Sequence, residues 1–118
     1  MSLQLAVVFP VVLTLLLLSV QAGLFFHARH VARAAANEGL RAARLYDHTA
    51  GDGQAVASQL LDQSGGDLIS ARHVSATRGA DIASVSVTGH AISLLPGLTL
   101  TIDETSSGPV ERFTPDTP

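Results

Sequence analysis

The first quarter of the chain is a nearly unbroken run of apolar residues, and the first charged side chain is Arg29. The clearly polar members of residues 3–26 are Gln4, Thr14, Ser19 and Gln21. As a helix this segment would be roughly 36 Å long, enough to cross a hydrocarbon core of about 30 Å. Because a lone segment in lipid must satisfy its own backbone hydrogen bonds, the pattern predicts a transmembrane helix over residues 3–26. Pro10 predicts a local kink or loosened turn within it.

Two other interpretations of this segment stay open. Val20-Gln21-Ala22 has small residues at the spacing that signal peptidase uses, so the segment could be a cleaved secretory signal. A helix that is apolar on all sides could also be the core of a soluble protein, but the rest of the chain is too short to surround it. We expect the helix to be retained, since the apolar run continues through Phe26.

Beyond the apolar run, residues 27–46 predict a continuation of the same helix, because alanine and arginine are strong helix formers. Small residues recur there at spacings of three and four and form one stripe: Ala28, Ala32, Ala35, Ala36, Gly39 and Ala43. Such a stripe lets another helix approach closely, so we expect it to be an assembly interface with other subunits. Packing of the stripe on the protein's own sheet is the alternative. Gly39 costs about 1 kcal/mol of helix propensity, which a close contact there would explain.

The remaining chain has the pattern of one short helix followed by strands. The predicted helix covers residues 53–63, with Asp52 as its N-cap and Ser64-Gly65-Gly66 as its end. Alternating apolar and polar residues predict strands over 68–77, 82–90 and 98–105, separated by turns at 78–81 and 94–97. In the middle strand Ile82, Val85 and Val87 are apolar, Ser84, Ser86 and Thr88 lie between them, and Ala83 breaks the phase of the alternation once.

These elements predict an α+β, pilin-like fold: a long N-terminal transmembrane helix continuing out of the membrane, a short second helix and a three-stranded antiparallel β-meander. One face of such a sheet can pack on a helix while the other faces water. The expected divisions are residues 1–46 for the helix (3–26 in the membrane, 27–46 beyond it), 47–107 for a small α+β domain, and 108–118 for a tail. Prolines in the segment after residue 105 predict an extended or disordered end.

Composition and charge exclude several classes of function. The net charge is −3 and the arginine-rich segment is confined to the helix, so no nucleic-acid footprint is visible. The chain has no cysteine and therefore no disulfide framework or thiolate metal site. His27 and His30 could share a helix face, but two imidazoles do not complete a zinc site. No nucleophile, base or phosphate-binding loop forms a motif, so we expect no enzymatic activity, no cofactor and no small-molecule substrate.

Two blocks of sequence have a more specific arrangement. The first is the anchor LAVVFPVVLTLLLL (residues 5–18), with a proline near its start, and the second is ARAAANEGLRAAR (residues 32–44). Together they resemble the TadE-like family of pilin-related proteins from tight-adherence (Flp pilus) gene clusters, whose members share an A-x-x-A-A-x-E-G-x-R-A-A pattern. The segment GPVERF (residues 108–113) is similar to the tail of actinobacterial members. The positions that match the family pattern or stand in its place are Gln4, Pro10, Glu38, Gly39 and Arg41.

The resemblance implies a single-pass protein of the cytoplasmic membrane, with its N-terminus inside and its domain outside, although arginines after the apolar run would by themselves favour the opposite orientation. It implies a non-enzymatic minor pilin or pseudopilin of Tad (Flp) pilus assembly or secretion. The implied partners are the lipid bilayer, other Tad pilus or pseudopilin subunits, and the assembly platform. The alternative function is a secreted or membrane-tethered ligand-binding module released by signal peptidase after Ala22.

The sequence departs from the family at two points. Family members carry a glutamate six residues before the proline, and this chain has Gln4 there. The resemblance implies that the carboxylate pairs with a neighbouring subunit's N-terminal amine, whereas an amide can hydrogen-bond but carries no charge. The family also has a basic leader that ends in a glycine-containing cleavage site. No such leader precedes the anchor in this sequence, and we expect that it was removed, that the true start lies upstream of Met1, or that this member is not processed.

Overall fold

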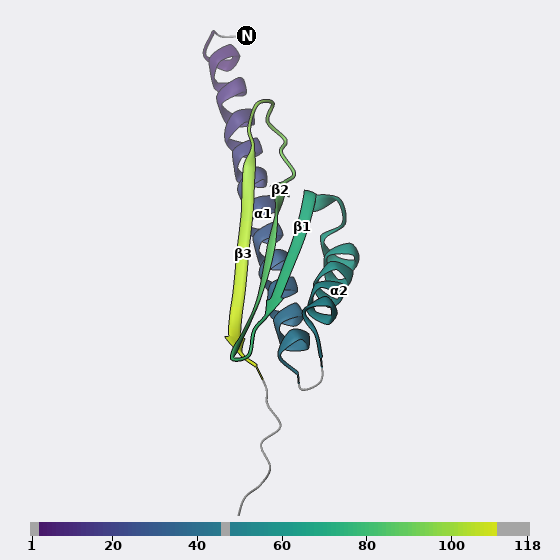
Figure 1. The fold of residues 1–118 in the computed structure, drawn as a ribbon. Coiled ribbons are helices and arrows are strands. Elements are labelled where there is room, and N and C mark those ends of the chain that lie inside the picture. The colour runs from purple at the N-terminus through teal and green to yellow at the C-terminus, as the bar shows by residue number, and fades with distance from the viewer. Residues whose placement is uncertain (1–2, 46–47, 111–118) are drawn as a thin grey trace, which may run out of the picture.

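The computed structural model describes residues 3–45 and 48–110 and confirms the predicted α+β fold (Figure 1). These described residues form two α-helices, two short helical turns and three strands: α1 (Leu3–Arg44), α2 (Ala50–Leu60), η1 (Leu61–Gly65), η2 (Gly66–Leu68), β1 (Ile69–Arg78), β2 (Ile82–Ala91) and β3 (Leu100–Pro109). The second half of α1 and the whole of α2 lie on one face of the sheet, while the first half of α1 projects beyond it (Figure 1).

The two predicted parts of the first helix form one continuous element, because α1 runs through Pro10 and past the end of the apolar segment. Arg78 closes the far end of this helix. Its guanidinium donates to the carbonyl oxygens of Ala43 and Leu45, 2.7 Å from each. These last carbonyls have no partner within the helix, so a cationic donor satisfies them.

The second helix begins three residues before its predicted start, and the prediction of Asp52 as N-cap is wrong. The N-cap is Thr49, whose hydroxyl accepts from the Asp52 backbone N–H at 3.3 Å. The Asp52 carboxylate accepts in return from the Thr49 N–H at 2.8 Å. Asp52 is therefore the third residue of a capping box, a motif that needs both members. Helical turns continue to Leu68, and Gly66 adopts a positive φ of 45° between η1 and η2.

The three strands form an antiparallel sheet in the order β1-β2-β3, as predicted. The inner face of the middle strand is made by Ala83, Val85, Val87, Gly89 and Ala91. Ile82, which precedes the break of phase at Ala83, is 62% exposed. Because side chains alternate along a strand, the buried Ala83 shares the face of Val85 and Val87, and Ile82 lies across from them.

Irregularities in the two outer strands account for the other differences. In β1 the register shifts between Ser70 and His73, where Ala71 has a φ of 52°. This bulge interrupts the alternation of side chains between the two faces of the strand. The strand predicted over residues 98–105 is displaced, since β3 continues to Pro109 by pairing with the first half of β2. Residues 46–47 and 111–118, including most of the predicted tail, lie outside the described residues, and the proposed domain divisions stay a prediction.

The core lies between α1, α2 and the inner face of the sheet. All six residues of the small-residue stripe (Ala28, Ala32, Ala35, Ala36, Gly39 and Ala43) are buried there. They pack on the protein's own domain, which was the alternative to assembly. In this conformation the stripe offers no surface to another subunit, so an assembly role for it would require the domain to leave the helix.

Gly39 lies at a close helix contact, as its cost in helix propensity suggested. A Cβ at Gly39 would stand 2.7 Å from the carbonyl oxygen of Gly53 and 2.9 Å from the Cβ of Ala57, both on α2. A Cβ at Gly53 would likewise meet the Gly39 carbonyl oxygen and the Ala43 Cβ, each at 2.7 Å. The two glycines therefore allow α1 and α2 to approach each other at backbone distance.

Candidate functional site

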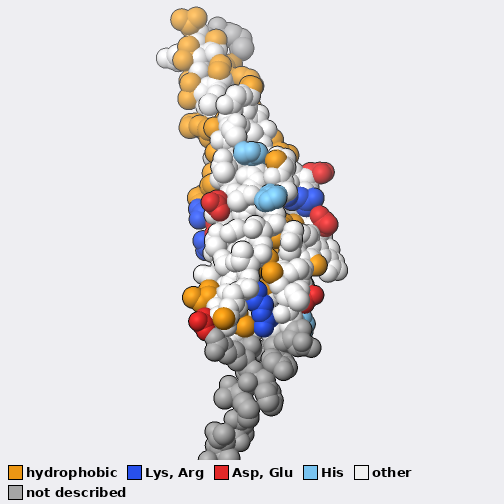
Figure 2. Space-filling view, viewed as in Figure 1, with side chains coloured by type: hydrophobic (Ala, Val, Ile, Leu, Met, Phe, Trp, Pro, Cys, Tyr) orange, Lys and Arg blue, Asp and Glu red, His pale blue; other side chains and the backbone are white. Residues whose placement is uncertain are grey.

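The first half of α1 is an apolar rod that the domain leaves bare. From Leu3 to Val20 every side chain is exposed except Leu17, which is half-buried. This bare segment (residues 3–20) would be about 27 Å long as a helix, close to the thickness of a hydrocarbon core. Figure 2 shows hydrophobic side chains at this end of the molecule, with the charged side chains lower down over the domain. An exposed apolar surface of this size is typical of a membrane or partner contact.

Most polar groups of the bare segment are satisfied within the helix itself. The hydroxyl of Thr14 donates to the Pro10 carbonyl at 2.8 Å, and that of Ser19 donates to the Leu15 carbonyl at 2.9 Å. Side-chain hydroxyls bonded in this way suit an apolar environment, because they leave no unpaired donor. Gln4 is exposed in the first turn. Its proposed role in assembly stays a prediction.

Gln21 joins the end of the bare segment to the β2–β3 loop (residues 92–99). Its side-chain N–H donates to the Ile92 carbonyl at 2.8 Å, and its side-chain oxygen accepts from the Leu94 N–H at 2.6 Å. The side chain is 4% exposed, so both bonds are shielded from water. In the sequence Gln21 is a polar member of an apolar run and the middle residue of Val20-Gln21-Ala22, and neither feature predicts its partners. A carboxamide buried in such a run was the available signal that something pairs with it.

Aromatic and basic side chains follow the bare segment by one to three turns. The rings of Phe25 and Phe26 are 5.9 Å apart, and the Arg29 guanidinium carbon lies 5.9 Å from the Phe25 ring centre. Phe26 is 62% exposed and, with Arg29, His30 and Arg33, lines a surface hollow. Aromatic rings and cations beside an apolar helix are typical of a membrane–water interface.

The same basic residues dock β3 on the helix. Glu104 on β3 lies 3.1 Å from the Arg29 Nε and 3.6 Å from the Arg33 Nε. The carboxylate side chain is 13% exposed while both arginines are more open, so solvent screens the pairs in part. His27 and His30 are both exposed. Within residues 3–45 and 48–110, no three histidine, aspartate or glutamate side chains come together to hold a metal ion.

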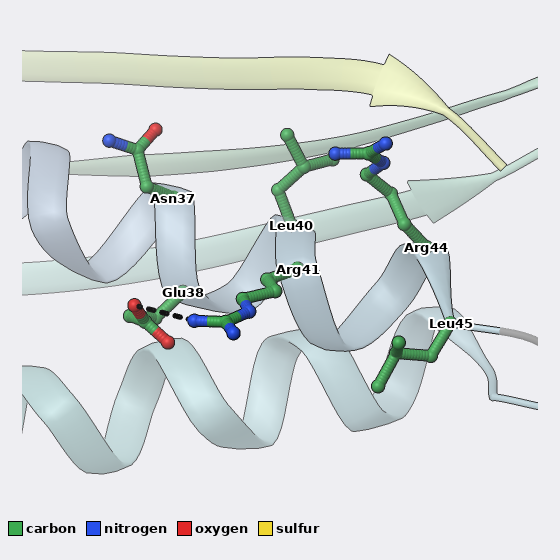
Figure 3. A pocket seen from close by; sticks show the side chains of 6 residues that line it. All are labelled: Asn37, Glu38, Leu40, Arg41, Arg44 and Leu45. Carbon is green, nitrogen blue, oxygen red and sulfur yellow. Dashed lines mark ion pairs between the residues drawn. The ribbon is translucent and has the colours of Figure 1, made fainter. Parts of the chain in front are cut away.

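At the far end of α1, the charged residues of the family pattern lie on the surface. Glu38 and Arg41 form an exposed ion pair at 3.9 Å beside a hollow that Asn37, Leu40, Arg44 and Leu45 also line (Figure 3). Figure 3 shows Arg44 directed toward β3, where its Nε donates to the Pro109 carbonyl at 2.7 Å.

Asn37 makes the neighbouring contact to β3, since its side-chain oxygen accepts from the Ser106 hydroxyl at 2.7 Å. The polar residues of α1 thus divide by role: Asn37 and Arg44 hold the strand, while Glu38 and Arg41 pair with each other and are exposed. Gly39, between them in sequence, is buried against α2.

The comparisons with known proteins agree with the resemblance drawn from the sequence. A family model described as TadE-like protein matches residues 1–41. The match covers the bare segment, the junction at Gln21 and most of the buried half of α1, including Glu38, Gly39 and Arg41. No curated protein and no solved structure matches the chain.

Proposed function

We propose that this chain, whose residues 1–41 match the TadE-like family, is a non-enzymatic minor pilin or pseudopilin of a Tad (Flp) pilus or secretion apparatus. The family match and the N-terminal apolar helix fit a pilus-associated membrane protein. The proposal adds a topology, in which α1 crosses the cytoplasmic membrane once, with the N-terminus on the inner side and the domain on the outer side. It also adds partners, which are other subunits of the pilus and its assembly platform.

The division of α1 into a bare half and a covered half carries this proposal. The bare half has the length and apolarity to stay in a bilayer, and the covered half packs against α2 and the sheet in one core. A subunit built in this way can wait in the membrane and later exchange lipid contacts for contacts with the apolar helices of neighbouring subunits. Both environments are apolar, so the exchange leaves the helix buried throughout.

The alternative function, a binding module released after Ala22, would change the structure at the junction. Cleavage there would remove Gln21 and leave the Ile92 carbonyl and the Leu94 N–H without their partner. The two hydrogen bonds couple residue 21 to the domain, and this contact supports retention of the helix.

Burial of the small-residue stripe changes where contacts with other subunits are expected. Because the small-residue stripe is covered by the domain, we propose the bare segment as the surface through which the chain meets other subunits. The exposed Glu38–Arg41 pair is the second accessible part of the family pattern.

One set of measurements tests anchoring, processing and orientation together. In native cells the protein should stay in the membrane pellet after alkaline carbonate extraction, with an intact mass that includes residues 3–22. Since the chain has no cysteine, Ala55→Cys on the exposed face of α2 gives a single reporter for a membrane-impermeant maleimide. Labelling is expected in intact cells. Labelling that requires permeabilised cells would refute the orientation, and a soluble chain that begins at Gly23 would refute the anchor.

The role in the apparatus is tested by complementing a deletion strain. Leu13→Asp places a carboxylate in the middle of the bare segment, where it costs about 3 kcal/mol in a membrane helix, and we expect loss of both membrane association and surface pili. Ile82→Asp makes the same chemical change at an exposed residue of the domain and should restore pili. Normal piliation of the uncomplemented deletion strain would overturn the proposed function.

A further inference from the structure

The β2–β3 loop (residues 92–99) is unusually apolar for an exposed connection. Its sequence is ISLLPGLT, and Ile92, Leu94 and Leu98 are exposed, with Leu94 at 42%. Leu95 is half-buried. Connections at a protein surface are normally polar. A cluster of aliphatic side chains on such a loop therefore indicates an apolar neighbour that covers it.

The loop lies at the end of the domain from which the bare segment emerges. Figure 1 shows it extending past the paired ends of β2 and β3 in the direction of the N-terminal half of α1. The two hydrogen bonds of Gln21 hold Ile92 and Leu94 against that helix. Leu17, one turn closer to the N-terminus, is the half-buried residue of the otherwise exposed bare segment.

Several backbone groups of the loop are paired within the protein itself. The N–H of Ile92 donates to the Leu68 carbonyl at 2.9 Å, and that of Leu94 donates to Gln21. Ser93 pairs locally with both the N–H and the carbonyl of Leu95, at 3.3 and 2.8 Å. The Leu98 N–H donates to the Leu95 carbonyl at 3.3 Å, and Pro96 has no N–H. Pairing of these groups lowers the cost of moving this part of the loop out of water.

We propose that the β2–β3 loop inserts its aliphatic side chains into the surface of the same bilayer that α1 spans, as a second lipid contact. The inference rests on the proposed membrane anchor. If residues 3–20 fill about 27 Å of a hydrocarbon core of about 30 Å, the membrane surface falls near Gln21. The loop is bonded to Gln21 and must lie at that level, while Phe26 and Arg29 reach the headgroups.

Two points of contact with the membrane would fix the orientation of the domain, which a single helix does not. A single membrane helix can rotate about its axis and tilt at small cost. A loop that enters the same leaflet beside the helix selects one rotation and one height for the domain. Every copy of the chain then presents Glu38 and Arg41 at the same distance from the membrane, which suits docking between subunits in a fixed register.

Fluorescence quenching tests the loop separately from the anchor. The full-length protein carries one NBD-labelled cysteine at Leu94→Cys, Leu13→Cys or Ile82→Cys, in vesicles of phosphatidylethanolamine and phosphatidylglycerol. The three sites report the loop, the anchor and an exposed apolar residue at the opposite end of β2. Nitroxide-labelled lipids should quench Leu13→Cys and Leu94→Cys several-fold more than Ile82→Cys, with a blue-shifted emission at both sites.

The other outcomes divide clearly. Quenching at Leu13→Cys but not at Leu94→Cys would overturn the loop contact and leave the anchor in place. Absence of quenching at both sites would overturn the anchor and the loop contact together. Equal quenching at Leu94→Cys and Ile82→Cys would show that the whole domain lies on the lipid and would also refute a contact specific to the loop. Circular dichroism of each labelled variant verifies that it is folded.

Discussion

Replacing Gly39 by alanine should destabilise the protein even though alanine is the better helix former. The new methyl group would lie 2.7 Å from the Gly53 carbonyl oxygen, 2.9 Å from the Ala57 Cβ and 3.2 Å from Val85 Cγ1. Contacts under 3.0 Å must be relieved by movement. Here one neighbour is a backbone oxygen and another is a Cβ fixed to its helix, so α1 and α2 have to separate.

The magnitude follows from two opposing effects. Overpacking of a closely packed site typically costs about 1–3 kcal/mol, and the backbone contact places Gly39→Ala toward the upper end of that range. The gain in helix propensity offsets about 1 kcal/mol. The net loss is therefore about 1–2 kcal/mol. For a domain of this size each kcal/mol corresponds to roughly 4–8 °C in Tm.

Gly23 supplies a matched control in the same helix. A Cβ at Gly23 meets nothing within 4 Å, so Gly23→Ala changes propensity without changing packing. Thermal unfolding of the full-length protein in detergent, followed by circular dichroism, should show a Tm that falls for Gly39→Ala and stays level or rises slightly for Gly23→Ala. If both substitutions raise the Tm, the contact between α1 and α2 at Gly39 is wrong.

Two further predictions concern how the domain is held on α1. Gln21→Leu keeps the side-chain volume but leaves two backbone groups of the β2–β3 loop unpaired, so we expect a loss of about 1–3 kcal/mol and faster hydrogen exchange confined to that loop. Unchanged exchange there would contradict the junction. Glu104→Gln removes the ion pairs to Arg29 and Arg33, whose exposure limits the expected loss to about 1 kcal/mol, a few degrees in Tm. The difference from the unmodified protein should shrink in about 1 M salt, and a loss that is independent of salt would point to packing instead.

Local patterns in the sequence were sufficient for the elements. A helix is specified by its own residues when an apolar run is long enough to cross a membrane and is followed by alanine and arginine, and α1 extends over both parts. Alternation predicted three strands, and short turns between them predicted an antiparallel meander. The same patterns gave wrong ends for elements whose limits depend on a hydrogen-bond partner. The N-cap of α2 depends on reciprocal hydrogen bonds between Thr49 and Asp52. The strand β3 extends beyond the segment with alternating apolar residues, because β2 offers backbone hydrogen-bond partners as far as Pro109.

By itself, the sequence determined the apolar rod, the α+β composition and the resemblance to TadE-like proteins, all of which depend on neighbours along the chain. The tertiary structure decided which surface the small-residue stripe meets, since alanine at helical spacing fits a second subunit and the protein's own sheet equally well. It also decided the role of Gln21, whose partners are 71 and 73 residues away in sequence. Contacts over such separations depend on where the whole chain folds back on itself, and no local pattern records that.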